Sequence, residues 1–430
     1  MAIPLQRVTQ NELIVMSPAR PPVYFLGIVF CLVANLVSVN ARALEWLAEP
    51  SVSVLEIYND NIQLTTATHD SVTGTIFSPK LQLTARSEIW DISSSAQFRD
   101  SNYSGIEGLD SKDNIYNLSS SYRTMRSQWQ LSGTSAKESL LAGETLNPDI
   151  SLARGQSQRD TKSGVLSFTH SFTETTRASL SYQNTDTVYE QGLARGQFDY
   201  QQGQVSLTVS EQYSERAQIF ITGGYSKYKV PANRFASENT TARLGVTYNF
   251  DETTKLTLSG GVRKTSSQGV LRECSLFEFR PPTITCREYR NTEVDSVDRG
   301  SVYDTSLEKQ FEASNLSIGY NRDVSSSSSG AQVETNALSV ASQRLIDPRN
   351  TLFFTTSYYR TRSLEASLSN TDRRYYQGES GWRWRCTEAC TLELSYRYAN
   401  VKYANASESA KSNALVLTLT YLWPKIYISR

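Results

Sequence analysis

The stretch NALVLTLTYLW, from Asn413 to Trp423, decides the fold of this chain. Its large apolar residues occupy every second position: Leu415, Leu417, Leu419, Tyr421 and Trp423. A strand points alternate side chains to opposite faces, so all five would share one face, whereas a helix would spread them around its circumference. We interpret the stretch as the closing strand of a membrane barrel, with its apolar face toward lipid.

The same unit recurs along the chain. The segments TARLGVTYNF (residues 241–250), KLTLSGGVRK (255–264) and CTLELSYRYAN (390–400) each send apolar or aromatic residues one way and polar or charged residues the other. Hydrophobic residues make up only 39% of the chain, which suits a sheet with one apolar face and one polar face. The pattern predicts an all-β fold, a transmembrane antiparallel up-and-down β-barrel.

Short and long breaks alternate between these units. Tight links such as IDPRN (346–350) and CTEAC (386–390) follow one strand, and longer polar segments follow the next. Outer-membrane barrels have short periplasmic turns and long external loops, and an even strand number places both ends of the barrel in the periplasm. We expect about eighteen strands. The two longest breaks, at 138–158 and 268–300, are the candidates for loops that fold into the lumen.

The N-terminus predicts an export signal. Arg20 precedes an apolar run from Val23 to Val37, and Ala41-Arg42-Ala43 matches a cleavage site. Residues 1–43 would then be a cleaved signal peptide and residues 44–430 a single barrel domain. The alternative is an uncleaved membrane anchor, and translation could start at Met16 instead of Met1.

The charge and cysteine content narrows the function classes. Lys+Arg and Asp+Glu are equal at 43 each, which gives no indication of a nucleic-acid partner. Four cysteines follow the signal: Cys274, Cys286, Cys386 and Cys390. An even number in an exported chain predicts disulfides, and we favour the two local pairs, with free thiols or a metal site as the alternative.

Catalysis has little support in the sequence. The chain has only two histidines, His69 and His170, and each adjoins a residue that could assist hydrolysis, Asp70 and Ser171. Adjacent residues on an extended chain point apart, so we read both as ordinary turn residues. We expect no enzyme activity, no catalytic residues, no metal and no cofactor.

Charged residues collect at positions predicted to face inward. These are Arg99, Arg243, Arg263, Arg360, Glu379, Arg383, Arg385, Glu393 and Arg397. Guanidinium groups along a lumen would favour anionic sugars. The alternative is that charged residues line the lumen only because water fills it, as in any porin. The 268–300 segment adds Arg272, Arg280, Arg287 and Arg290 beside aromatic residues. They would contact a sugar, or belong to a disulfide-stiffened external cap.

Short motifs near the N-terminus carry a family resemblance. The segments EIYNDNIQLT (56–65), FSPKLQL (77–83) and WDISSSAQFRDSNYSG (90–105), with the terminal LTLTYLWPK, are similar to the β-barrel porin 2 family. The chain particularly resembles outer-membrane barrels that accompany exosortase and exopolysaccharide (PEP-CTERM) systems. Outer-membrane barrels typically end on an aromatic residue, whereas seven residues, PKIYISR, follow Trp423 here. Either the assembly signal tolerates a tail or the last strand lies later.

The resemblance implies a bacterial outer-membrane porin or conduit for exopolysaccharide or other polar solutes. Expected partners are outer-membrane lipid, the barrel assembly machinery, polysaccharide and periplasmic export components. Two other classes stay open: a closed structural or glycan-binding barrel, and a soluble all-β protein. Extraction of membranes with urea or carbonate would release the soluble protein and leave a barrel behind.

Overall fold

The computed structural model describes residues 45–66, 69–139, 158–190, 197–280, 283–327, 332–364, 372–403 and 407–428. The predicted signal, residues 1–43, and most of the predicted 138–158 loop lie outside these ranges, and the single-domain boundary stays a prediction. In the part of the chain that is described, no helix has the length and apolar character needed to cross a bilayer.

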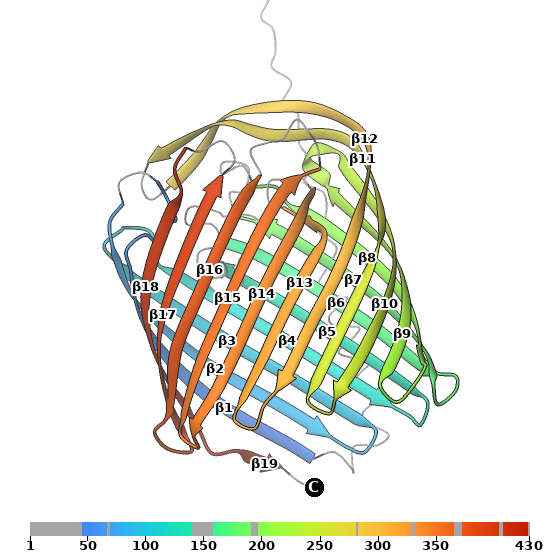
Figure 1. The fold of residues 1–430 in the computed structure, drawn as a ribbon. Helices are drawn as coiled ribbons and strands as arrows, with labels where there is room; N and C mark the ends of the chain where they lie inside the picture. The colour runs from blue at the N-terminus through green and yellow to red at the C-terminus, as the bar shows by residue number, and fades with distance from the viewer. Residues whose placement is uncertain are drawn as a thin grey trace, which may run out of the picture. The chain divides into compact units, whose positions relative to one another are not determined.

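Strands β1 to β18 form one antiparallel barrel in which each strand pairs with its neighbours in sequence (Figure 1). Their bounds are β1 Glu45–Asn59, β2 Val72–Arg86, β3 Trp90–Ser104, β4 Ser111–Arg123, β5 Ser127–Ser139, β6 Gln158–Ser171, β7 Thr176–Tyr189, β8 Tyr200–Gln212, β9 Ala217–Val230, β10 Phe235–Asp251, β11 Thr254–Arg280, β12 Thr283–Gln310, β13 Ser314–Ser326, β14 Gln332–Asp347, β15 Asn350–Ser363, β16 Arg373–Arg385, β17 Cys390–Tyr403 and β18 Ala410–Leu422. The predicted fold class is confirmed.

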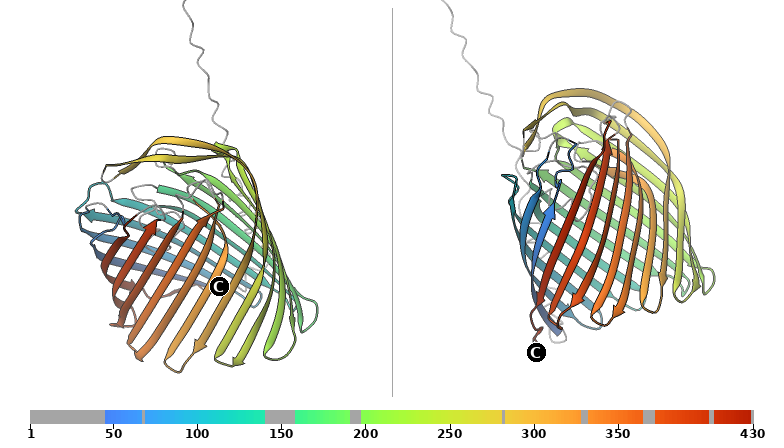
Figure 2. Two further views of the ribbon diagram at one scale, coloured as in Figure 1. Left: turned by 45° about the horizontal axis from the view of Figure 1, so that its top comes forward. Right: turned by 60° about the vertical axis from the view of Figure 1, so that its left-hand side comes forward.

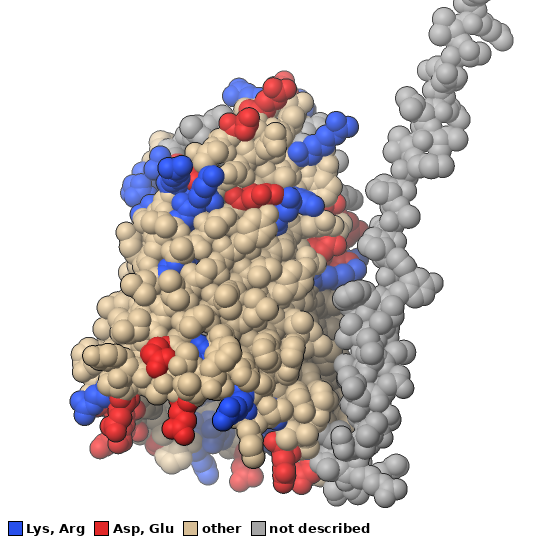
Figure 3. Space-filling view, turned by 90° about the vertical axis from the view of Figure 1, so that its right-hand side faces the viewer, with Lys and Arg blue, Asp and Glu red and all other residues tan. Residues whose placement is uncertain are grey.

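The alternation predicted for the last strand is present in the structure. On β18 the side chains of Leu415, Leu417 and Leu419 are 51%, 41% and 45% exposed, whereas the intervening Ala414 and Val416 are 3% and 4% exposed. The exposed parity faces outward and the buried parity faces the interior. Figure 3 shows Lys, Arg, Asp and Glu gathered at the two ends of one outer face, with few in the belt between. A closed barrel with such a belt is a bacterial outer-membrane protein, and its long connections mark the external end.

Strands β1 and β18 close the barrel, and a side-chain clasp sits at the top of their seam. The strands pair from Ser51↔Leu422 to Asn59↔Ala414. Beyond that point both carboxylate oxygens of Asp60 accept hydrogen bonds from Asn413, through its backbone N–H and its Nδ2, each at 2.7 Å. The buried Asn61 amide donates to the carbonyl oxygen of Lys411 at 2.8 Å. Residues about 350 positions apart in sequence are thereby joined.

The C-terminal tail extends the seam at the periplasmic end. The short strand β19 (Ile426–Ile428) pairs antiparallel with Trp46–Ala48 at the start of β1. The Nζ of Lys425 lies 2.8 Å from Oε1 of Glu49. The last wall strand therefore ends at Leu422, and Ile426–Ile428 form a separate short strand rather than a later closing strand.

The expected external loop at 268–300 is wrong, because the segment is strand. Strands β11 and β12 pair from Thr254↔Lys309 to Arg280↔Thr283, far beyond the last pairs with their neighbours, Ala236↔Gln268 and Tyr303↔Arg322. Above those pairs the hairpin leaves the wall and bends over the external end (Figures 1 and 2). Neither face of this upper hairpin meets lipid, so the sequence lacks the apolar alternation by which the other strands are recognised.

Gly269 lies where the hairpin leaves the wall. Its φ is +130°, and a Cβ at this position would lie 2.3 Å from the carbonyl oxygen of Arg234. Only glycine adopts this conformation at so close an approach of two backbones without strain.

We expect Asn61→Ala to lower the free energy of unfolding by about 2 kcal/mol, because buried backbone groups lose their amide partner. Asn61 also accepts the backbone N–H of Thr65, so the loop that follows would loosen as well. Urea unfolding followed by the gel-mobility shift of the folded barrel measures the change. Asn102→Ala, at an exposed position, is the control and should change stability by less than about 0.5 kcal/mol. Equal stability of the two variants would show that the clasp does not hold the seam.

Candidate functional site: the barrel interior

One wall of the interior, from β3 to β11, is lined by hydroxyl and amide side chains. Inward residues on adjacent strands bond across the sheet at 2.9 to 3.4 Å: Asn117 with Ser95 and Thr134, Ser167 with Ser181, Thr169 with Ser179, Thr208 with Thr222, and Thr247 with Thr257. Ser167, Ser181, Thr208 and Thr222 are all half-buried, so solvent reaches them. Since they point inward, the solvent that reaches them lies within the barrel.

The opposite wall, on β16 and β17, carries ion pairs. Arg383 donates to Oε2 of Glu393 through Nη2 at 2.7 Å and Nε at 2.8 Å, and its guanidinium lies 5.5 Å from the ring centre of Phe353. Nη2 of Arg397 lies 3.2 Å from Oε1 of Glu379. In each pair the positive charge is offset by a neighbouring carboxylate.

A denser charge cluster lies beneath the β11–β12 hairpin. The side chain of Arg263 is 2% exposed; its Nη1 lies 2.6 Å from Asp298 and its Nη2 lies 2.9 Å from Glu334. Glu334 accepts a second guanidinium, that of Arg322, at 2.9 Å. The cluster joins β11 and β12 to the β13–β14 hairpin, and such a desolvated network requires every member to be paired.

Two further predicted arginines are also paired. Arg243 on β10 reaches Asp323 on β13 across the inner face of two intervening strands. Arg99 and Asp113, on β3 and β4, form a nearly fully buried pair at 3.3 Å. Arg385, at the periplasmic end of β16, has an exposed side chain. The eight predicted lumen residues other than Arg360 therefore share the inward parity of their strands.

Arg360 was predicted to face inward, but the structure places it on the outer face. It lies on the same face of β15 as the exposed Tyr358, and its register partner Arg374 lies on the same face of β16 as the exposed Tyr376. Arg360 therefore points outward. The face of β15 was misassigned because both of its faces carry polar residues near the external end, which hides the alternation.

The external end of the interior is packed by residues 61–65, which the sequence analysis did not place inside the barrel. Residues 61–65 fold inward after β1, and each of them is 1% to 8% exposed. Leu64, with a positive φ of 46°, packs against Tyr375, Val401 and Ala410 on β16, β17 and β18. Ile62 packs on the other side against Val72 and Leu109. The positive φ of Leu64 that helps to turn this segment inward has no recognisable signature in the sequence.

The β11–β12 hairpin is packed against the same end. Val294 joins Phe198, Tyr228 and Phe235 in a buried cluster, and Tyr289 lies 6.3 Å from Phe198, measured between ring centres. The hairpin is thereby fixed over the barrel through side chains of β9, β10 and the segment before β8. The sequence left open whether this segment contacts a sugar or forms a disulfide-stiffened cap, and Tyr289, one of its aromatic residues, packs against the barrel.

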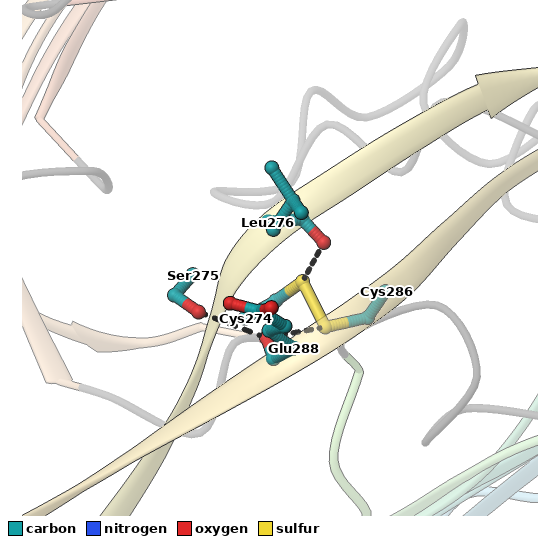
Figure 4. Close-up of a disulfide and its surroundings, with 5 residues drawn as sticks. All are labelled: Cys274, Ser275, Leu276, Cys286 and Glu288. Atoms are coloured by element: carbon teal, nitrogen blue, oxygen red, sulfur yellow. Dashed lines mark hydrogen bonds between the residues drawn. A yellow bond between two sulfur atoms is a disulfide. The ribbon is translucent and has the colours of Figure 1, made fainter.

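A disulfide joins the two strands of the hairpin. Cys274 and Cys286 are bonded, and close by the hydroxyl of Ser275 donates to the carbonyl oxygen of Glu288 at 3.2 Å (Figure 4). Of the predicted contact arginines, Arg287 forms an ion pair with Glu278 at 2.5 Å and Arg290 is exposed. The side chains of Arg272 and Arg280 lie outside the described part of the structure.

The second predicted disulfide is absent. Cys386 and Cys390 are free thiols at the β16–β17 turn. The hydroxyl of Thr387 accepts the backbone N–H groups of Ala389 and Cys390, and the N–H of Thr387 donates to the carbonyl oxygen of Cys390, so hydrogen bonds close this turn without a bridge.

The two histidines lie apart from the interior polar groups. Nδ1 of His170 is 2.8 Å from the hydroxyl of Ser127, and its ring lies between those of Phe168 and Phe172 at the periplasmic end. His69 lies in the connection after β1. Within the described ranges, His, Cys, Asp and Glu form no group of three or more that could hold a metal ion.

The chain matches no protein-family model and no curated protein sequence. Its fold is similar to solved outer-membrane proteins at low identity. OccAB4 of Acinetobacter baumannii is 7% identical with a TM-score of 0.45, over 90% of this chain and 100% of that one. OccK9 (OpdG) of Pseudomonas aeruginosa is 10% identical with a TM-score of 0.45, over 87% and 98%. A BenF-like porin from Pseudomonas fluorescens Pf-5 is 8% identical with a TM-score of 0.44, over 88% and 99%. At these levels neither residues nor solutes carry over to this chain.

We expect Arg263→Met to lower the free energy of unfolding by about 3 kcal/mol, because Glu334 loses one of its two arginines and Asp298 loses its ion pair. Arg287→Met is the matched control, because its ion pair with Glu278 is far more exposed and should contribute no more than about 1 kcal/mol. Denaturant unfolding of both variants gives the comparison. A loss of similar size in the two would contradict the structural role of the buried cluster.

Proposed function

We propose that this barrel is a passive conduit for polar, hydroxyl-rich solutes across the outer membrane, with saccharides as the solute class. The observation that carries the proposal is the solvent-accessible wall of Ser, Thr and Asn side chains between β3 and β11. Hydroxyl and amide groups both donate and accept hydrogen bonds, so they can exchange partners with a sugar as it moves.

The interior charges favour neutral or mixed solutes over purely anionic ones. Arg243, Arg263, Arg383 and Arg397 each have a carboxylate partner. A guanidinium group with a carboxylate partner attracts distant anions less than an unpaired one does. Anion-selective pores use rings of unpaired Arg or Lys side chains around the channel. The anionic-sugar preference expected from the sequence is therefore weaker in our proposal than a preference for uncharged hydroxyl groups.

The finer proposal is that the saccharide is an exopolysaccharide that leaves the cell. It rests on the motif resemblance at the N-terminus and on the hydroxyl-lined wall. The barrel would work without a cofactor or a chemical step. Its proposed partners besides lipid are the barrel assembly machinery and periplasmic export components.

A second function is favoured by the packing at the external end. Residues 61–65 and the β11–β12 hairpin occupy that end with buried side chains, among them Leu64 and Val294. A barrel closed in this way would be structural, or would hold a surface glycan without passing it. The two functions differ in whether ions cross the protein.

Single-channel conductance in a planar bilayer tests the conduit directly. We expect the wild type to conduct, and a variant in which Leu271–Thr292 are replaced by Asn-Gly to conduct more, because the cut removes the upper hairpin and keeps Val294 in place. Asn102→Ala serves as the control with unchanged conductance. Stable insertion without any conductance, in both the wild type and the shortened variant, would leave the closed glycan-binding barrel as the function.

Block of the current by polymers tests the solute class. We expect neutral and anionic polysaccharides of equal length to block the wild type at similar concentrations, within about threefold, because the interior arginines are paired. In Glu379→Gln with Glu393→Gln, which leaves Arg397 and Arg383 without carboxylates, the anionic polymer should block at lower concentration. A strong anionic preference already present in the wild type would contradict the charge-balanced conduit.

A further inference from the structure

Three cations form a row on the outer face near the external end of the barrel. The register pairs Arg360 on β15 directly with Arg374 on β16, and Arg374 directly with Lys402 on β17. All three side chains are exposed and share the outward parity of Tyr358 and Tyr376. Like charges placed directly across a sheet repel one another, so this row costs stability unless something neutralises it.

No carboxylate of the described residues forms an ion pair with this row. Asp372, two residues before Arg374, accepts the backbone N–H of Ser363 at 2.7 Å. Glu334, diagonal to Arg360 in the register, is bound by Arg263 and Arg322. These two acids are thus committed to other partners, and the three cations face away from the barrel.

Four other outward cations near the external end face an acid, whereas Lys264 on β11 faces Arg299 on β12. The register places Asp100 opposite Lys112, Lys137 opposite Asp160, Lys162 opposite Asp186, and Lys227 opposite Glu238. The last pair is an ion pair at 2.5 Å. Figure 3, which views the side of the barrel opposite β17 and β18, shows both signs of charge together at the upper rim. Unlike these four cations, the three cations on β15 to β17 face one another in the register.

Tyrosines lie directly below the row on the same three strands. Tyr358 pairs with Tyr376 in the register, and the ring centres of Tyr376 and Tyr398 lie 6.1 Å apart. Tyrosine belts mark the level where hydrocarbon gives way to headgroups. The cations one step farther out therefore lie at the level of the headgroups of the outer leaflet.

We propose that Arg360, Arg374 and Lys402 form a binding site for a phosphorylated glycolipid of the outer leaflet, with its headgroup phosphates as the bound groups. Guanidinium groups bind phosphate oxygens in a bidentate manner, and an ammonium adds a further charge-assisted bond. The tyrosine row contacts the adjoining acyl chains and sugar. The phosphates supply the negative charge that the described residues do not place opposite these cations.

Binding of diphosphorylated lipid A to the full-length barrel in detergent, with divalent cations chelated, tests the site. We expect Arg360→Gln with Arg374→Gln and Lys402→Gln to weaken binding about tenfold or more, because several charge-assisted bonds are lost. Native mass spectrometry and a titration of bound lipid give the affinity. Because all three residues are exposed, the variant should keep the gel mobility and heat stability of the folded barrel.

The matched control removes the same number of outward cations elsewhere: Lys137→Gln, Lys162→Gln and Lys227→Gln. These residues face acids, so the control should bind lipid A as the wild type does. Fully dephosphorylated lipid A should bind the wild type about as weakly as the row variant binds the phosphorylated form. Equal loss in the two triple variants, no preference for the phosphorylated lipid, or displacement of the lipid by an equal concentration of inorganic phosphate would each overturn the proposal.

Discussion

Closure of the sheet at the β1–β18 seam is the constraint on which the rest of the structure depends. Backbone N–H and C=O groups within a bilayer have no water partner, so a membrane sheet is stable only when its first and last strands pair. The clasp of Asp60 with Asn413 and of Asn61 with Lys411 sets the register at the top of this seam. Asn61 is also the first residue of the segment that turns into the interior. The same short stretch therefore closes the barrel and packs its external end.

Once the barrel is closed, each strand separates two environments. The outward parity carries leucine and aromatic residues, and the inward parity carries hydroxyls on one wall and ion pairs on the other. Inside, each interior guanidinium for which an ion pair is described has a carboxylate from a neighbouring or facing strand, as Arg263 has from Glu334. Outside, the Arg360 row has none in the described residues. Charge is thus balanced where the protein is desolvated and left unbalanced where it faces a headgroup region.

The β11–β12 hairpin shows how a single element can belong to two environments. The part of β11 up to Gln268 and the part of β12 from Tyr303 onward are barrel wall. The rest is a two-stranded arm joined by the Cys274–Cys286 bond. A two-stranded ribbon alone is marginal in water. The contacts of Tyr289 and Val294 with the barrel, together with the Arg263 cluster below, supply the stability that the arm lacks alone.

The sequence by itself determined the strands, their faces and the alternation of short and long connections, because the period of two is a local property of each strand and lipid demands it of one face. It also gave one correct cysteine pair, Cys274 with Cys286. Only the tertiary structure decided that 268–300 is an arm of the sheet, that residues 61–65 fold inward, that Arg360 points outward and that Cys386 and Cys390 stay free. The first two outcomes depend on side chains that meet across the lumen or around the seam, and such contacts join residues far apart in the chain that no local period records. The last two are local: both faces of β15 are polar near the external end, and Thr387 closes the β16–β17 turn without a bridge.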